Sequence, residues 1–175
     1  PKPSLAKKPG SKRARAWFLD RRGSREGKEM SSTPRLAVRA ILMHENRLLL
    51  VNAYRGRSDL WCAPGGGVEK HSPLPENLQR EMREETGLEI SVGLPCLVNE
   101  FHDPNGSFHQ VDIYFRCTLV SGELSDTWRD PEGVVTHRKW VTRAEAEALR
   151  IKPDSLVEIA WGGGVGYDLL EPILR

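Results

Sequence analysis

The sequence predicts an α/β fold in which helices pack on a mixed β-sheet. Segments rich in apolar and β-branched residues recur along the chain, and amphipathic helical segments lie between them with no internal repeat. The length of 175 residues suits one domain with short appendages. The apolar runs are far shorter than the ~20 residues that a membrane-spanning helix needs. We therefore expect a single domain that does not cross a membrane.

The first predicted element is a β-hairpin over residues 35–54. Its two strands, 35–43 and 47–54, are rich in leucine, valine and isoleucine, and the polar segment 44–46 supplies the turn. A loop from Gly56 to Gly67 follows, because it contains proline and a run of glycines.

A helix is predicted next, from about residue 73 to 86. Ser72 is a plausible N-cap, Pro73 suits the first helical position, and Gly87 fits the left-handed position after the helix. One face of this helix carries an apolar residue at every fourth position and is expected to pack on the sheet: Leu74, Leu78 and Met82.

The remaining elements are shorter. Strands are predicted over 89–101, 108–119 and 135–141. Thr142 and Glu145 form a capping box that opens a helix to about residue 149. Residues 156–161 predict one further helical turn, and the tail after them has no clear pattern.

Charge divides the chain into a predicted basic N-terminal arm, 1–33, and a domain, 34–175. Residues 1–29 carry a net charge of +7 and residues 30–175 a net charge of −5. The arm could attract nucleic acid, serve as a solvated leader, or lie upstream of a start at Met30. Its Trp17 and Phe18 could pack on the domain or on a second copy in a homodimer.

Three cysteines are spread along the chain with no close pair: Cys62, Cys96 and Cys117. An odd, scattered set argues against a disulfide framework and against a four-cysteine zinc site. The composition therefore favours a reducing, cytoplasmic location.

Three carboxylates converge on one face of the predicted helix. Glu81, Glu84 and Glu85 lie within a ~100° arc. Two like charges at i and i+4, and two anions in the last helical turn, are both locally unfavourable. Such a set suits a hard divalent cation, Mg²⁺ or Mn²⁺. A solvated charged helix is the alternative interpretation, and the helix alone favours it.

The glycine run before the helix favours the cation site over the solvated charged helix. Pro64 and the three glycines after it allow backbone to approach an ion or ligand closely. At this spacing, residues 66–88 resemble the signature of the Nudix hydrolase family, G-x5-E-x7-R-E-U-x-E-E-x-G-U with U aliphatic. The resemblance extends over about 34–150 and implies a Nudix-like α-β-α sandwich. The matching residues are Gly66, Arg80, Glu81, Met82, Glu84, Glu85, Gly87 and Leu88.

One position departs from the family pattern. Ser72 stands where the first glutamate is expected, so Arg80 loses its usual partner, and Glu76 is the candidate substitute. The glutamates that face the metal in the family come later in the signature and are all present.

The resemblance implies metal-dependent hydrolysis of a pyrophosphate linkage in a nucleoside diphosphate derivative. Members that cleave ADP-ribose resemble this chain in having a proline near the position of Pro104, which implies an ADP-ribose-like substrate, although residues 103–106 also read as an ordinary turn. The resemblance assigns Glu84 and Glu85 as metal ligands, Glu81 as ligand or general base, and Arg80 as the residue that orients them. Gly66 and the loop residue Glu132 are further candidate ligands, with Asp130 as the alternative to Glu132.

The candidate substrate-binding residues come from less specific patterns than the candidate metal ligands do. Arg55 and Arg57 could bind phosphate, and Trp61 and Phe108 could stack on a base, although core packing is an ordinary role for such aromatic residues. Two other functions stay open. Ser72 motivates a non-catalytic nucleotide-binding module, and the basic arm motivates a pyrophosphohydrolase of RNA ends.

Overall fold

The computed structural model describes residues 33–174, and their centre is a mixed sheet of eight strands. The predicted α/β class is confirmed. The expectations for the basic arm, including Trp17 and Phe18, lie outside the described residues. Within residues 33–174, each helix is too short or too polar to cross a membrane.

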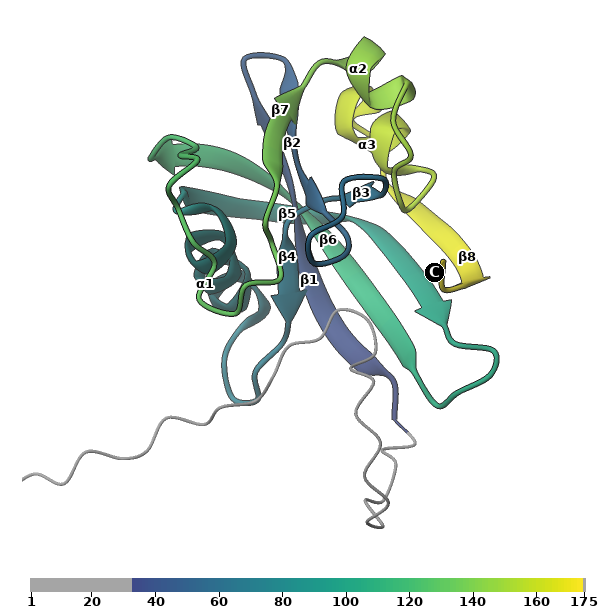
Figure 1. Cartoon of the computed structure of the whole chain (residues 1–175). Coiled ribbons are helices and arrows are strands. Elements are labelled where there is room, and N and C mark those ends of the chain that lie inside the picture. The colour runs from purple at the N-terminus through teal and green to yellow at the C-terminus, as the bar shows by residue number, and fades with distance from the viewer. Residues whose placement is uncertain (1–32, 175) are drawn as a thin grey trace, which may run out of the picture.

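The sheet combines parallel and antiparallel pairs in the order β3-β2-β1-β6-β5-β8, with β4 on β1 and β7 on β2 (Figure 1). The β1–β6 and β5–β8 pairs are parallel, and the others are antiparallel. The strands are β1 (Arg35–His44), β2 (Arg47–Asn52), β3 (Trp61–Cys62), β4 (Gly65–Gly67), β5 (Glu89–His102), β6 (His109–Ser121), β7 (Arg138–Val141) and β8 (Gly166–Pro172).

Helices cover the sheet on both sides (Figure 1). The helix α1 (Leu74–Thr86) packs Leu78 and Met82 against a cluster of apolar residues from β1, β2 and β6. The helix α3 (Leu156–Gly162), beside the short α2 (Arg143–Glu147), packs on a second cluster that includes Ile41 and Tyr114. Because alternate side chains of a strand face opposite sides, one sheet supplies both cores.

Most of the local predictions are confirmed. The β1–β2 hairpin turns at Glu45 and Asn46, which both have positive φ. Gly87 ends α1 in the left-handed conformation, with φ 75°. Thr142 and Glu145 form the predicted capping box, with both reciprocal hydrogen bonds present.

Other local predictions need correction. Ser72 does not cap α1: Pro73 takes the cap position, and no side chain bonds to the cap. The helix after Thr142 ends at Glu147, two residues earlier than predicted. The tail without a clear pattern contains β8, which joins the sheet by parallel pairing with β5, a contact that no local sequence pattern reports.

Candidate active site

The acidic face of α1 is buried rather than solvated. Glu81 is 2% exposed and Glu85 is 5% exposed, whereas Glu84 is half-buried. Both buried carboxylates face β4, the short glycine strand that pairs with β1. The interpretation of this helix as a solvated charged surface is therefore wrong.

Two glycines allow the carboxylates to lie against the backbone of β4. The Gly65 N–H donates to Oε2 of Glu85 over 2.8 Å. A Cβ on Gly66 would lie 2.5 Å from Oε2 of Glu81, which is closer than any real contact. Gly65 has φ +135°, a conformation that other residues rarely adopt. The glycine run thus provides the space in which the two carboxylates sit.

The surroundings of Glu85 disfavour the charged form of its carboxyl group. Burial, together with the neighbouring carboxylates of Glu81 and Asp130, raises the pKa of Glu85 well above its ordinary value. The Gly65 N–H and the guanidinium of Arg39 oppose the shift without cancelling it. A cation beside Glu85 would favour its ionised form.

The positive charge of Arg80 offsets part of the negative charge on the acidic face of α1. Its guanidinium donates to Glu81 over 2.9 Å and to Glu84 over 3.2 Å, and also to the amide oxygen of Asn77 over 3.2 Å. The expectation that Glu76 replaces the missing glutamate is wrong, because the hydrogen bonds and ion pairs of Arg80 go to these other residues. Asn77, one turn into α1, holds Arg80 instead.

The donor set matches the preference of Mg²⁺ or Mn²⁺ for oxygen ligands. Within residues 33–174, no group of three or more Asp, Glu, His or Cys side chains has the geometry to hold a metal ion as it stands. The guanidinium of Arg80 lies between Glu81 and Glu84. The buried Glu81–Glu85 pair fits a cation, and Arg80 holds one oxygen each of Glu81 and Glu84 beside it.

A loop before β7 contacts α1, where the Trp128 indole N–H donates to the Glu84 carbonyl oxygen over 3.0 Å. Asp130, 8% exposed, accepts hydrogen bonds from the backbone N–H groups of residues 132, 134 and 135. Arg55 donates to the carbonyl oxygens of Glu132 and Gly133. The structure therefore brings Arg55 and Glu132 together, and Asp130 organises the loop that carries Glu132.

The other predicted substrate residues are not gathered with the carboxylates. Arg57 pairs with Asp59 on the surface. Trp61 is buried in the core, with the ammonium of Lys139 4.0 Å from its ring centre. Phe108 stacks at a tilt on Phe101, with ring centres 5.8 Å apart.

A buried ion pair behind β4 was missed by the sequence analysis. Arg39, 1% exposed, donates to Asp112 over 3.2 Å and to the Gly65 carbonyl over 2.9 Å. It thereby fixes the strand on which Glu85 rests. The available signal was an arginine at an inward position of an apolar strand, because a buried charge needs a partner.

Comparisons with known proteins identify the family of this chain. The NUDIX domain model matches residues 33–161. An ADP-ribose pyrophosphatase of Methanocaldococcus jannaschii is 33% identical over 97 residues, which are 52% of this chain and 54% of that protein. The chain thus spans about half the length of the curated relatives that it matches.

Solved structures share the fold. A UDP-X diphosphatase superimposes with a TM-score of 0.58 at 23% identity, covering 80% of this chain and 70% of that one. An ADP-ribose pyrophosphatase of Streptococcus suis gives a TM-score of 0.58 at 18% identity, covering 78% of this chain and 100% of that one. The predicted Nudix-like sandwich is confirmed by these neighbours. Since the family model covers most of the chain, the chain belongs to the NUDIX domain family.

Proposed function

We propose that this protein hydrolyses a pyrophosphate linkage in a nucleoside diphosphate derivative, with an ADP-ribose-like compound as the leading substrate. The observation that carries the proposal is the pair of buried carboxylates, Glu81 and Glu85, packed against a strand whose glycines leave room for them. The name of the M. jannaschii relative supports the choice of substrate.

Nudix hydrolases generally use divalent metal ions, and this donor set suits Mg²⁺ or Mn²⁺. Glu81, Glu84 and Glu85 would hold the ion, with the backbone at Gly66 and the side chain of Glu132 as further candidate ligands. When bound, such an ion neutralises phosphate oxygens and acidifies water.

The chain's own residues position these groups. Arg80 orients Glu81 and Glu84 through its two hydrogen bonds. Glu81, held between Arg80 and the open face of Gly66, is the candidate general base. Arg55, beside Glu132, is the candidate phosphate contact, because a guanidinium matches the geometry of phosphate oxygens.

A substrate panel tests the proposal. The purified protein is incubated with Mg²⁺, with Mn²⁺ and with a chelator, and products are separated for ADP-ribose, a dinucleoside polyphosphate, a nucleoside triphosphate and capped RNA. We expect metal-dependent release of AMP and ribose 5-phosphate from ADP-ribose, and loss of about 10²-fold or more in turnover for Glu84→Gln.

The same panel separates the competing functions. Capped RNA as the preferred substrate would replace our proposal with the RNA-end hydrolase. Nucleotide binding without turnover of any compound would show a binding module instead. Glu76→Gln is the matched control, because Glu76 is exposed on the same helix and should leave turnover unchanged.

A further inference from the structure

The last turn of α1 is held by two side chains from outside the helix. The indole N–H of Trp128 donates to the carbonyl oxygen of Glu84 over 3.0 Å, and the guanidinium of Arg138 donates to the carbonyl oxygen of Glu85. The last carbonyl oxygens of a helix have no partner within it and need donors from elsewhere. Here the donors act on the backbone of the same two residues whose side chains are candidate metal ligands.

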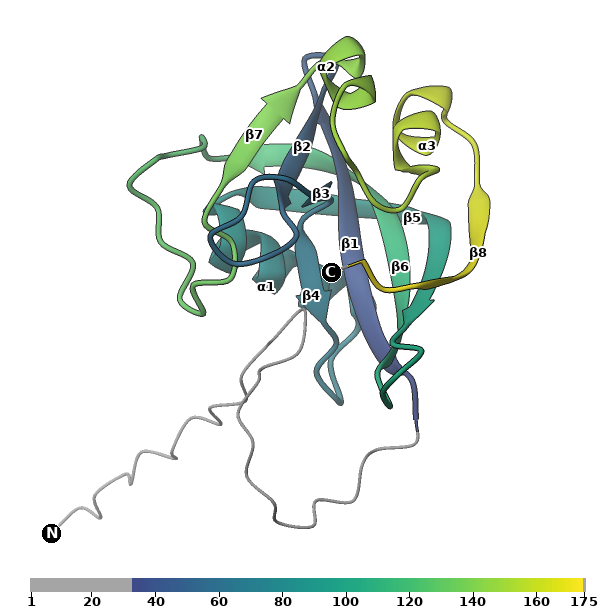
Figure 2. The ribbon, with the colours of Figure 1, turned by 45° about the vertical axis from the view of Figure 1, so that its right-hand side comes forward.

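Both donors come from one stretch of the chain. Trp128 lies in the β6–β7 connection, residues 122–137, and Arg138 is the first residue of β7. The two ribbon views agree that this connection runs alongside α1 (Figure 1, Figure 2). The connection therefore reaches the helix at the turn that carries Glu84 and Glu85.

The indole ring of Trp128 also packs on the end of the helix. A Cβ on Gly87 would lie 3.0 Å from two carbon atoms of the ring, which is tighter than nine in ten real contacts. The side chain is 39% exposed, so burial of its apolar surface is incomplete. Trp128 thus combines a close ring contact with a hydrogen bond at one helix end.

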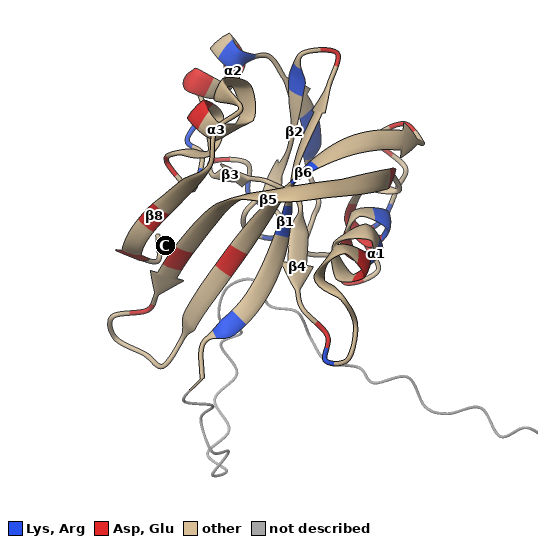
Figure 3. Cartoon of the chain, turned by 180° about the vertical axis from the view of Figure 1, so that it is seen from behind, with Lys and Arg blue, Asp and Glu red and all other residues tan. Residues whose placement is uncertain are grey.

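The charge of Arg138 suits its position. Carbonyl oxygens at the C-terminal end of a helix carry partial negative charge, and Glu84 and Glu85 add two carboxylates to the same turn. Acidic and basic positions lie close together on α1 (Figure 3). Arg138 is half-buried, so its attraction to this end of the helix is less screened than that of an exposed arginine.

Arg138 also ties the helix to the loop that carries Glu132. Its guanidinium donates to the carbonyl oxygen of Val135 over 3.2 Å. The N–H of Val135 donates to Asp130 over 2.9 Å, and Asp130 also accepts from the N–H of Glu132. A chain of hydrogen bonds therefore runs from the backbone of Glu85 to the turn at Glu132.

We propose that Trp128 and Arg138 are positioning residues, which hold Glu84 and Glu85 in the arrangement that receives the divalent cation. They act through the backbone of α1. A displacement of about 1 Å at a functional group is enough to impair a site of this kind. The inference rests on the proposed function for the identity of the site, but cation binding can be measured without turnover.

The experiment measures Mn²⁺ binding by the full chain, from the electron paramagnetic resonance signal of free Mn²⁺, beside the melting temperature and ADP-ribose turnover. Trp128→Phe keeps a ring but removes the N–H donor. We expect Mn²⁺ affinity and kcat each to fall about tenfold, because residues that orient metal ligands usually contribute at least that much. A merely structural role would lower the melting temperature and leave Mn²⁺ affinity unchanged.

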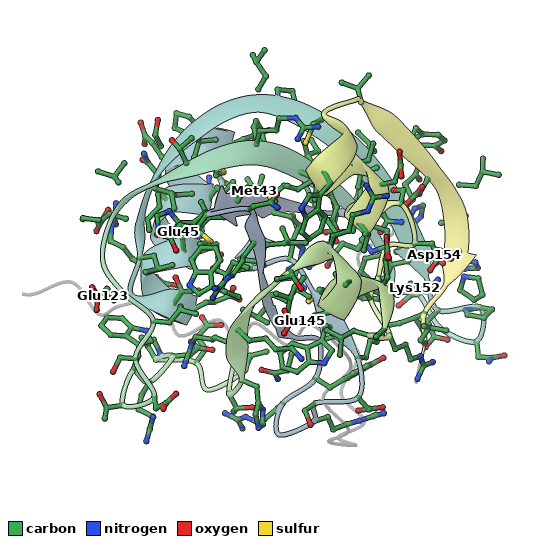
Figure 4. The ribbon with its side chains drawn as sticks, turned by 90° about the horizontal axis from the view of Figure 1, so that it is seen from above. Met43, Glu45, Glu123, Glu145, Lys152 and Asp154 are labelled. Atoms are coloured by element: carbon green, nitrogen blue, oxygen red, sulfur yellow. The ribbon has the colours of Figure 1, made fainter. Side chains whose placement is uncertain are left out.

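Two control variants separate this role from general effects. Trp161→Phe removes an indole N–H that also makes one hydrogen bond, to Asn46 over 3.2 Å, from the helix α3. Glu123→Gln lies in the same connection as Trp128, at the outer edge of the molecule (Figure 4). Both should keep wild-type Mn²⁺ affinity and turnover.

The second positioning residue is tested by removal and partial rescue. Arg138→Met should weaken Mn²⁺ binding about tenfold or more, and Arg138→Lys, which keeps the charge and a donor, should bind Mn²⁺ more tightly than Arg138→Met.

Wild-type Mn²⁺ affinity in both Trp128→Phe and Arg138→Met overturns the inference, as does an equal loss in Trp161→Phe. No Mn²⁺ binding by the wild type would overturn both the inference and the proposed metal site. Mn²⁺ affinities that change as expected, without turnover of any substrate, would overturn only the proposed function.

Discussion

At the residue scale, two adjacent glycines serve different purposes. Gly65 fills a place where a side chain would collide with the carbonyl oxygen of Val38, and its φ is +135°. At Gly66 the three nearest atoms that a Cβ would meet all belong to the Glu81 carboxylate. We therefore expect Gly65 to be needed for the fold, and Gly66 for the position of the Glu81 carboxylate.

Alanine substitutions at these two positions should give opposite results. Gly65→Ala should lower the free energy of unfolding by about 2 kcal/mol or more, because backbone atoms cannot move away from the new side chain. Gly66→Ala should fold, but it should lose about 10²-fold in turnover because Glu81 is displaced. Denaturant unfolding and steady-state kinetics on both variants measure this. Equal loss of stability in both would refute the distinction.

Glu85 predicts a particular pH dependence of stability in the metal-free protein. Its pKa is raised in the folded state, mainly by burial, so the folded protein keeps this proton to higher pH than the unfolded chain. Stability should then fall as pH rises from the ordinary carboxyl range towards the raised pKa.

Removing the carboxyl group should remove this dependence. Glu85→Gln should show a higher melting temperature than the wild type above that range, when both are measured without metal across pH 4 to 8. A melting temperature that is lower than the wild type at every pH would mean that Glu85 stabilises the fold as an ionised group, contrary to the account.

At the element scale, α1 is tied to its preceding loop by Asn77 rather than by a conventional cap. The Asn77 side chain accepts from the Glu69 N–H and donates to the carbonyl oxygens of Ser72 and Pro73. It also accepts from Arg80. One buried amide thereby joins the loop, the start of the helix and the arginine that orients the carboxylates.

This arrangement predicts a contrast between two nearby positions. Asn77→Ala should lower the free energy of unfolding by about 1–3 kcal/mol, because it leaves buried backbone groups without partners. Ser72→Ala should change it by no more than about 0.5 kcal/mol, since the Ser72 side chain caps nothing. Chemical denaturation checks both. A larger loss at Ser72 than at Asn77 would show that the serine is the true anchor.

At the scale of the whole molecule, the features that the sequence predicts are those set by residues close together along the chain. The β1–β2 hairpin, the end of α1 at Gly87 and the capping box at Thr142 are set by local turn and cap chemistry. The burial of Leu78 and Met82 follows from helical periodicity. The acidic cluster was also visible, because its residues lie within two turns of one helix.

Long-range contacts were not predictable in this way. The Arg39–Asp112 pair joins residues from β1 and β6, and β8 is held by pairing with β5. Neither has a local pattern, because a partner far along the chain decides it. The degree of burial of Glu81 and Glu85 depends in turn on how β4 packs under α1.

The central proposal is that the buried acidic face of α1, packed on the glycine strand β4, makes this protein a metal-dependent pyrophosphohydrolase. Its most direct test is the Mg²⁺-dependent rate of ADP-ribose hydrolysis in the wild type, Glu85→Gln and Glu76→Gln. The account predicts wild-type turnover for Glu76→Gln and a loss of about 10²-fold or more for Glu85→Gln. Equal turnover in all three proteins would contradict it.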